Sequence, residues 1–266
     1  MHASAPPTCR LEYESPVALL RADRDLAHKL SDSVLRKLEP RLLAHVVRLT
    51  AGRWEAPWLP ASDGDAVAGW PLGLLVLDGM LLREVRVRTD TASRAERAVG
   101  VELLGPGDLL RPWQDDEGEL LRCSSSWQIF QPARLALLDR RIARATGSWP
   151  ELMDELLERS LRRSRWLTVT IAVNSAGTAR ERLVLTSEHL ADRWGRMTPE
   201  GIVIPLPLNH RMLAELTGMT RPTCSGALSW LARHELLSRR REGTWWLRPD
   251  AREQLTRLLA AEDRSN

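Results

Sequence analysis

The stretch that decides the fold lies at residues 209–233 and reads NHRMLAELTGMTRPTCSGALSWLAR. It opens with an asparagine, whose side chain can cap a short helix. If His210 is the first position, then Ala214 is the fifth, Gly218 the ninth and Cys224 the fifteenth. A small residue permits a close helix crossing, glycine permits a sharp turn with positive φ, and the cysteine faces the core between two helices. This spacing predicts a helix-turn-helix.

The second helix of the motif and the segment after it are expected to contact a partner. The side chain of Thr220 can cap this helix, and Pro222 falls in its first turn, where a missing N–H costs nothing. Residues 236–247 form two short apolar runs around Glu-Gly, beside three consecutive arginines, which predicts a β wing. Hydroxyl and guanidinium groups hydrogen-bond phosphates and base edges. We therefore predict DNA contacts for His210, Arg211, Thr220, Arg221, Thr223, Ser225, Ser229, Arg233, Arg239, Arg240, Arg241 and Thr244.

The local charge supports this prediction. The net charge of residues 210–257 is +4, whereas that of the whole chain is +3, so positive charge gathers where phosphates would bind. Simpler interpretations remain: the spacing also occurs in helical hairpins that bind nothing, and an arginine run can be a solvated surface. Trp245 and Trp246 are expected to pack in the core and support the wing rather than to stack on bases.

Composition limits the class of protein. The chain has 266 residues, of which 43% are hydrophobic and 5% aromatic, enough to bury the core of two compact units or of one large one. No run of about 18 apolar residues and no secretory signal is present, so we expect a cytoplasmic protein without a membrane span. The cysteines at 9, 123 and 224 are too far apart for a disulfide framework or a metal cluster. Of 38 basic residues only Lys29 and Lys37 are lysines, a bias typical of GC-rich genomes, so arginine abundance alone is not evidence of function.

The pattern before the motif predicts a β domain followed by a long helix. Apolar residues at helical spacing over 25–49, interrupted by Pro40, predict a helical lead-in. Residues 52–138 have short apolar runs between glycines and prolines, which predicts antiparallel strands. Turns are expected at Asp78-Gly79, as a hairpin, and at residues 105–108 and 131–132.

The long helix is expected over 150–174, with a second helix over 179–194 and a short strand over 202–206. The apolar stripe of the long helix either packs in the core or pairs with the same helix of a second copy. The predicted dimer residues are Leu156, Leu157, Leu161, Leu167 and Ile171. The fold class is α+β, with an extension at 1–24, a β-roll domain with its helical lead-in at 25–147, a dimerisation helix at 148–176 and a winged helix domain at 177–266.

This combination resembles the Crp/Fnr family of bacterial transcription regulators. The resemblance is carried by residues 206–209 and 213–223, together with Leu228 and Leu231. The stretch around Asp78-Gly79 and the turn at 104–108 are similar to a cyclic-nucleotide-binding β-roll. The resemblance implies a homodimer that reads palindromic double-stranded DNA, and RNA polymerase is a candidate further partner. No cluster of catalytic residue types is visible in the sequence, so we expect neither enzyme activity nor a cofactor.

The sequence departs from the nucleotide-binding members of that family after Gly107-Asp108. Those members continue with Gly-Glu-Leu, whose Glu engages the ribose, and later place an Arg beside Ser or Thr for the cyclic phosphate. Here residues 109–113 read LLRPW, and an acidic loop follows at 115–117. We expect the usual cyclic-nucleotide motif to be lost. The candidate effector residues are Arg111, Trp113, Arg122 and Ser124, where Arg122 is either a displaced phosphate contact or a strand residue facing solvent.

Other sensor and enzyme classes lack the residues they need. Three scattered cysteines cannot hold an iron–sulfur cluster, and no histidine lies between His45 and His189 to ligate haem or metal in the β domain. The serines at 124–126 have no paired His and Asp nearby. The alternative is an architectural or protein-interaction factor that binds DNA with low sequence specificity and no small-molecule effector. It is favoured by Gly226, because family members often carry an arginine there.

Overall fold

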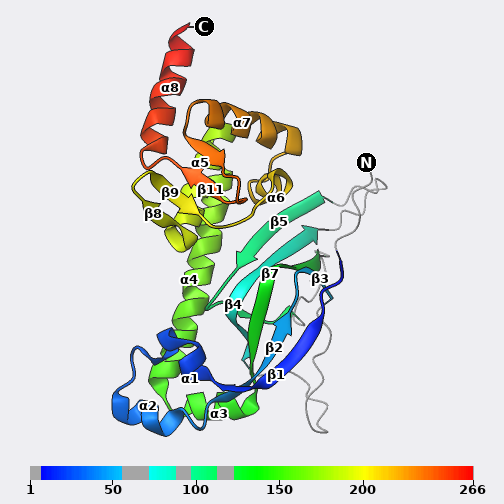
Figure 1. Ribbon diagram of the computed structural model, residues 1–266, viewed down its shortest axis with the longest axis vertical. Coiled ribbons are helices and arrows are strands. Elements are labelled where there is room, and N and C mark those ends of the chain that lie inside the picture. Colours follow the sequence, from blue (N-terminus) through cyan, green and yellow to red (C-terminus); the bar gives the residue numbers. More distant parts are fainter. Residues whose placement is uncertain (1–6, 56–71, 88–96, 113–122, 266) are drawn as a thin grey trace. The chain divides into compact units, whose positions relative to one another are not determined.

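The computed structural model describes residues 7–55, 72–87, 97–112 and 123–265. By its internal contacts the chain divides into two compact units, residues 1–165 and 166–266. Helix α4 (Pro150–Asn174) begins in the first unit and ends in the second (Figure 1). Over the part of the chain described, no helix is both long and apolar enough to cross a membrane.

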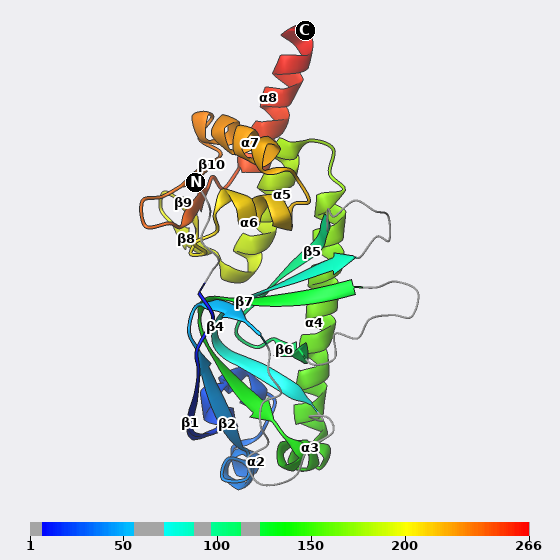
Figure 2. The same ribbon diagram turned by 90° about the vertical axis from the view of Figure 1, so that its right-hand side faces the viewer.

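The first unit is built on an antiparallel sheet, whose described part has seven strands. Its long strands β4 and β7 lie side by side along most of their length (Figure 2). One apolar core, with Trp54 and Trp127, lies within the sheet, and a second lies between the sheet and the helices. The path through the sheet is β1 (Leu11–Ala18), β2 (Leu43–Leu49), β7 (Cys123–Leu138), β4 (Gly73–Val87) and β5 (Arg97–Leu104), while β3 (Gly52–Trp54) pairs with β7 and β6 (Leu109–Leu110) with β4.

Asp78 and Gly79 form a bulge inside β4, so the predicted hairpin turn is wrong. The register with β7 shifts on both sides of Asp78. Gly79 has φ +84°, and a Cβ there would lie 2.2 Å from the carbonyl oxygen of Pro132. The turn predicted at 131–132 is also wrong, because β7 runs through it and Pro132 stands beside the bulge. The positive φ of Gly79 and the missing N–H of Pro132 are both features of a bulge between the long strands β4 and β7, and neither residue forms a turn.

The turn at 105–108 is confirmed. Gly107 has φ +89°, and the N–H of Asp108 donates to the carbonyl of Gly105 at 3.1 Å. The buried carboxylate of Asp108 accepts a hydrogen bond from the N–H of Gly105 at 2.8 Å. This side chain closes the turn that leads into β6.

The helical lead-in is confirmed only in its first half. Short helices α1 (Leu19–Ala22), η1 (Arg24–Ala27) and α2 (Asp32–Leu38) precede β2. Residues 43–49, predicted as helical, form β2 because they pair with β1 on one side and β7 on the other. Tertiary pairing outweighs the local helical period. The sheet itself begins at Leu11, inside the stretch predicted as an extension.

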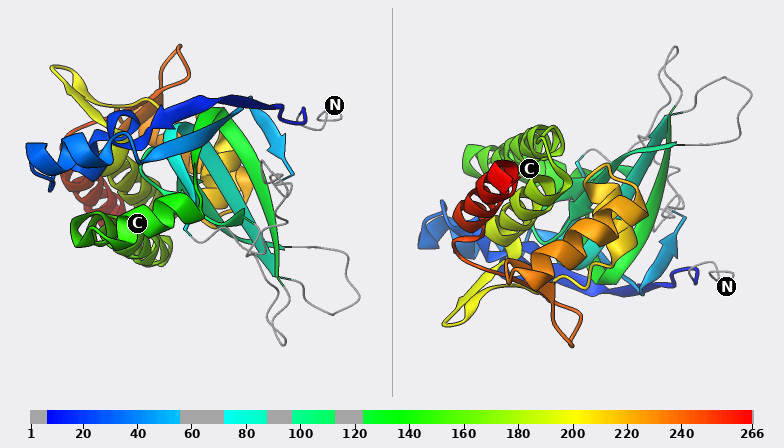
Figure 3. Two further views of the ribbon diagram at one scale, coloured as in Figure 1. Left: turned by 90° about the horizontal axis from the view of Figure 1, so that it is seen from below. Right: turned by 90° about the horizontal axis from the view of Figure 1, so that it is seen from above.

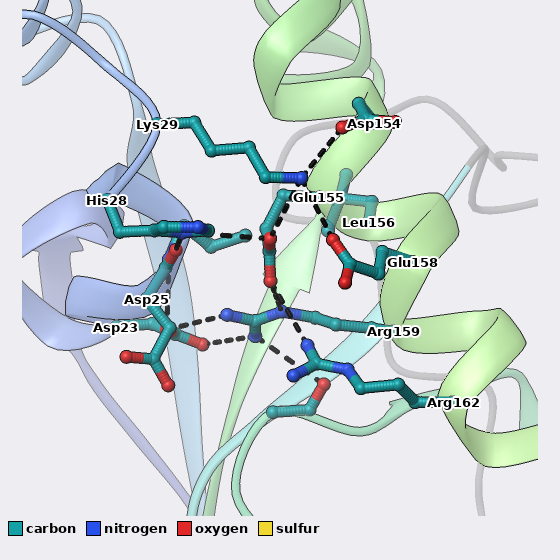
Figure 4. A network of polar contacts seen from close by, with 12 residues as sticks. Asp23, Asp25, His28, Lys29, Asp154, Glu155, Leu156, Glu158, Arg159 and Arg162 are labelled. Carbon is teal, nitrogen blue, oxygen red and sulfur yellow. Dashed lines mark hydrogen bonds and ion pairs between the residues drawn. The ribbon is translucent and has the colours of Figure 1, made fainter.

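Helices α3 (Arg140–Gly147) and α4 follow β7, and α4 confirms the predicted long helix. Leu152 and Leu156 of α4 are buried against the first unit. A buried ion cluster fixes the same segment (Figure 4): the guanidinium of Arg159 is bound by the carboxylate of Asp23 at 2.5 and 2.9 Å and by Glu155 at 3.1 Å. Arg159 also lies 3.5 Å from the carbonyl oxygen of Gly107, so α4 is tied to the turn at 105–108.

The second unit is a winged helix. Its described strands form one sheet in the order β10-β11-β9-β8, and in Figure 3 the β8–β9 and β10–β11 hairpins project from the helices. Its apolar core includes Leu183, Leu213 and Leu231. The elements in chain order are α5 (Ala179–Trp194), β8 (Arg196–Thr198), β9 (Gly201–Ile204), α6 (His210–Leu216), α7 (Arg221–Arg233), β10 (Leu237–Arg239), β11 (Trp245–Leu247) and α8 (Ala251–Ser265).

Candidate nucleic-acid interface

Helices α6 and α7 begin and turn as the sequence predicts. The side-chain oxygen of Asn209 accepts a hydrogen bond from the N–H of Met212 at 3.0 Å, and that of Thr220 from the N–H of Thr223 at 3.4 Å. Gly218 has φ +62° in the turn between the helices. The two caps and this turn fix the angle between α6 and α7.

The inner side of α7 is packed. Cys224 is fully buried and Ala227, Leu228 and Leu231 lie beside it in the core. Burial raises the pKa of the Cys224 thiol to about 11, so the side chain stays a neutral thiol and acts as a small apolar group. The predicted packing role of this cysteine is confirmed.

The outer side of α7 carries a polar row. Arg221, Ser225 and Ser229 are spaced by four residues and therefore lie along one face of the helix. Arg221 and Ser229 are exposed, and the Ser229 hydroxyl donates to the carbonyl of Ser225 at 2.9 Å. The Oγ of Ser225 lies 3.1 Å from Nδ1 of His210 on α6. Thr223 is exposed as well.

The wing is held by its tryptophans. Trp245 is buried and donates from Nε1 to the carbonyl of Leu208 at 3.0 Å, and Trp246 donates to the carbonyl of Glu200 at 3.0 Å. Both contacts are intramolecular, as expected for residues that support the wing. Gly243 has φ +84° in the wing turn.

The residues of the wing and of α6 that are predicted to contact DNA differ in exposure and in whether an acidic side chain pairs with them. Arg239 and Arg241 are exposed, whereas Arg240 is paired with Glu200 at 2.9 Å. Arg211 is exposed and paired with Glu215 at 2.8 Å. The hydroxyl of Thr244 is buried and has no hydrogen-bond partner in the described part of the chain, so the structure does not present it for the DNA contact predicted for it.

A groove of about 360 Å³ runs beside α7. Thr223, Gly226 and Arg233 line it from α7, and residues 178–180 line it from the start of α5. The guanidinium of Arg180 lies over the ring of Trp230 at 4.0 Å and pairs with Glu262 at 2.7 Å. Arg180 is not predictable from the local sequence, because only the fold brings the start of α5 next to α7.

The first unit contains a separate pocket of about 480 Å³. Leucines and Met153 line much of it, together with the ring of Trp127. Arg163, on α4, donates to the buried carboxylate of Glu102 at 2.5 and 2.7 Å and to the carbonyl of Leu109 at 2.8 Å. The pocket thus combines apolar side chains with three arginines at its wall, Arg83, Arg111 and Arg163.

The structure brings only part of the predicted effector set to this pocket. Arg111 lines it and donates from Nε to the carbonyl of Leu72 at 3.1 Å. Ser124 lies exposed on β7, opposite Arg86, and is not among the residues that line the pocket. Trp113 and Arg122 lie outside the described residues. Arg83 and Arg163 are not predictable from the local sequence, because strand register and the packing of α4 bring them to this wall.

The apolar stripe of α4 divides into two faces. Leu156, predicted as a dimer residue, is buried in the core of its own protomer. Leu157 and Leu161 are 56% and 53% exposed, and Ile171 is 68% exposed. Leu167 is half-buried. The exposed part of the stripe includes Met153, four residues before Leu157.

Comparison with known proteins agrees with this geometry. A family model described as a Crp-like helix-turn-helix domain matches residues 182–258. No curated protein matches the sequence.

Solved structures share the fold of the whole chain. A mutant of CooA from Carboxydothermus hydrogenoformans is 18% identical, with 91% of this chain and 97% of that chain covered and a TM-score of 0.54. A cyclic nucleotide-binding domain containing protein from Listeria monocytogenes is 17% identical, with coverage of 76% and 88% and a TM-score of 0.55. The c-di-GMP responsive regulator CLP from Xanthomonas campestris is 18% identical, with coverage of 82% and 99% and a TM-score of 0.52.

The likeness extends over the antiparallel β domain, α4 and the winged helix, because it covers 76–91% of this chain. The predicted α+β class is confirmed. The chain carries a Crp-like helix-turn-helix domain at residues 182–258, and it shares its overall fold with these solved structures.

Proposed function

We propose that the protein acts as a homodimer that reads a palindromic DNA site, with one α7 in the major groove of each half-site. The observation that carries this proposal is the outer side of α7, where Arg221 and Thr223 are exposed and Ser225 and Ser229 extend the row. An arginine in this position can bond both acceptors of a guanine edge. The exposed arginines of the wing, Arg239 and Arg241, would contact phosphates.

The dimer is proposed to form through α4. Met153, Leu157 and Leu161 are spaced by four and stay exposed in the single chain, at 40%, 56% and 53%. An exposed apolar row on a long helix is stabilised when the same row of a second helix covers it. A two-fold dimer would also place two copies of α7 on a symmetric site. Contact with RNA polymerase is a further proposal and rests on the family alone.

The β domain is proposed to have lost the cyclic-nucleotide site. A cyclic phosphate needs fixed donors when it leaves water. In the pocket of the first unit, Arg163 is bound by Glu102, and Nε of Arg111 is bound by the carbonyl of Leu72. Arg163 and Arg111 therefore donate these hydrogen bonds to groups of the protein and not to a bound phosphate.

Two substitutions test the assignment of α7. Arg221→Ala should weaken binding to the preferred duplex by about 1–3 kcal/mol and relax the preference at one position of each half-site. Arg241→Ala should weaken binding to all sequences alike and reduce the salt dependence. The assignment is wrong if Arg221→Ala changes neither the preferred sequence nor the affinity in fluorescence anisotropy titrations.

A further inference from the structure

His210 connects three elements of the winged helix. It is the first residue of α6, and its Nδ1 lies 3.1 Å from the Oγ of Ser225 on α7. Its half-buried ring also lies near Trp245 of β11, with 6.1 Å between ring centroids. The histidine is therefore held from two sides while it contacts the exposed row of α7.

Ser225 stands in the middle of that row. Arg221 precedes it by four residues and Ser229 follows it by four, so the three side chains lie on one face. The neighbouring row contains Pro222 and Gly226, which offer no polar side chain. Ser225 is therefore the polar side chain at the centre of this row.

We propose that His210 is a positioning residue that sets the direction of the Ser225 hydroxyl for contact with a base. The proposal rests on the proposed function, because it places α7 in the major groove. A serine hydroxyl holds one proton and two lone pairs, and it rotates to suit its partner. Contact with an imidazole nitrogen removes that freedom.

Whether Nδ1 of His210 carries a proton decides what Ser225 offers to DNA. With Nδ1 unprotonated, the hydroxyl donates to it, and the serine oxygen is left to accept from the amino group of adenine or cytosine. With Nδ1 protonated, the ring donates to the serine oxygen, and the hydroxyl proton is free for an acceptor such as guanine O6 or thymine O4. His210 thus acts on base preference without touching a base.

The charged groups around His210 set its response to pH. Burial, then Arg239 of β10 and Arg221 of α7, lower the pKa of His210 below its ordinary value of 6.5. On α6 itself, Arg211 is paired with Glu215. The free protein therefore carries a neutral His210 at pH 7. Bound phosphates favour the charged imidazolium form of His210, so DNA binding takes up a proton. The affinity for DNA should therefore rise as the pH falls from 7.5 to 5.5.

The test compares discrimination between bases. A duplex is first selected from random sequence with the wild-type protein, and the ratio of Kd between each single-base variant and that duplex is measured by fluorescence anisotropy at fixed salt. Ser225→Ala and His210→Leu should each reduce discrimination at the same base pair, by about tenfold. The double variant should lose no more than either single variant.

Two further variants separate positioning from folding. His210→Asn places an amide near the position of Nδ1 and should retain most of the discrimination, but its affinity should no longer rise between pH 7.5 and 5.5. The matched control is His234→Asn, because His234 is a half-buried histidine of the same unit that hydrogen-bonds the carbonyl of Trp230 at 2.9 Å. It should leave both the discrimination and the pH profile unchanged. Thermal melting of each variant checks that it is folded.

The outcomes distinguish this proposal from the proposed function. If Ser225→Ala loses discrimination while folded His210→Leu and His210→Asn keep both the discrimination and the wild-type pH profile, the role of His210 is refuted and α7 remains the recognition helix. If Ser225→Ala changes nothing while Arg221→Ala still relaxes the preference, only the positioning proposal fails. If neither Ser225→Ala nor Arg221→Ala alters discrimination, the placement of α7 in the groove fails.

Discussion

Gly218 and Gly226 show how the backbone conformation at a glycine decides whether alanine in its place stabilises or destabilises the protein. A Cβ added at either position would meet no heavy atom within 4 Å. Gly218 has φ +62° in the turn, whereas Gly226 lies within α7 with no positive φ. Alanine is strained in the first conformation and favoured in the second.

Gly226→Ala is therefore expected to stabilise the protein by about 0.5–1 kcal/mol, because alanine loses less backbone entropy in a helix. Gly218→Ala is the matched control and should destabilise it by about 1–2 kcal/mol. Urea unfolding of both variants measures the difference. A loss of stability in Gly226→Ala would show that the glycine is required by the fold itself.

At the scale of the element, the buried guanidinium of Arg159 holds the first half of α4 against the first unit. The side chain of Arg159 is 4% exposed, and its partners Glu155 and Asp23 are 3% and 10% exposed. Arg162 binds the same oxygen of Glu155 at 3.1 Å but is 55% exposed. Two arginines thus share one carboxylate in different environments (Figure 4).

Arg159→Met should destabilise the first unit by about 3–5 kcal/mol, because it leaves two carboxylates without their buried partner. Arg162→Met, the matched control, removes an exposed contact to the same carboxylate and should cost at most about 1 kcal/mol. Urea unfolding compares the two. Equal losses in both variants would mean that the burial of Arg159 is not what stabilises α4.

The exposed row of α4 makes a separate prediction. Leu157→Asp together with Leu161→Asp should give a monomer that no longer binds a palindrome tightly, because two charges would enter the apolar seam. Met197→Asp is the control, since Met197 is 75% exposed and lies in β8. Light scattering at micromolar concentration gives the mass. A wild-type protein that is already monomeric there would contradict the dimer.

Elements also differ in how far the sequence predicts them. The caps at Asn209 and Thr220 and the turn at Gly218 act within a few residues, so their helices follow from the local sequence. Gly79 was misread as a turn because its cause, the backbone of Pro132, lies on another strand. The pairing of His210 with Ser225 was missed for the same reason: both were predicted as DNA residues, but only the crossing of α6 and α7 joins them.

At the scale of the whole molecule, we expect that cyclic AMP and cyclic GMP do not bind. The turn at Gly107 is present, but β6 and Pro112 follow it, and proline has no N–H to offer a phosphate. Isothermal titration with both nucleotides provides the measurement. Micromolar binding, about −8 kcal/mol, that is lost on replacing Arg111 or Arg122 would overturn this prediction.

The central claim is that a dimer reads a specific palindrome through α7. Selection of the wild-type protein on random duplexes, followed by titration of selected and random duplexes at two salt concentrations, tests it most directly. We expect a two-fold symmetric site whose half-sites lie about 10 base pairs apart or a multiple of that, and tighter binding of this site than of random duplexes at both salt concentrations. Equal affinity for selected and random duplexes, falling alike with salt, would contradict it.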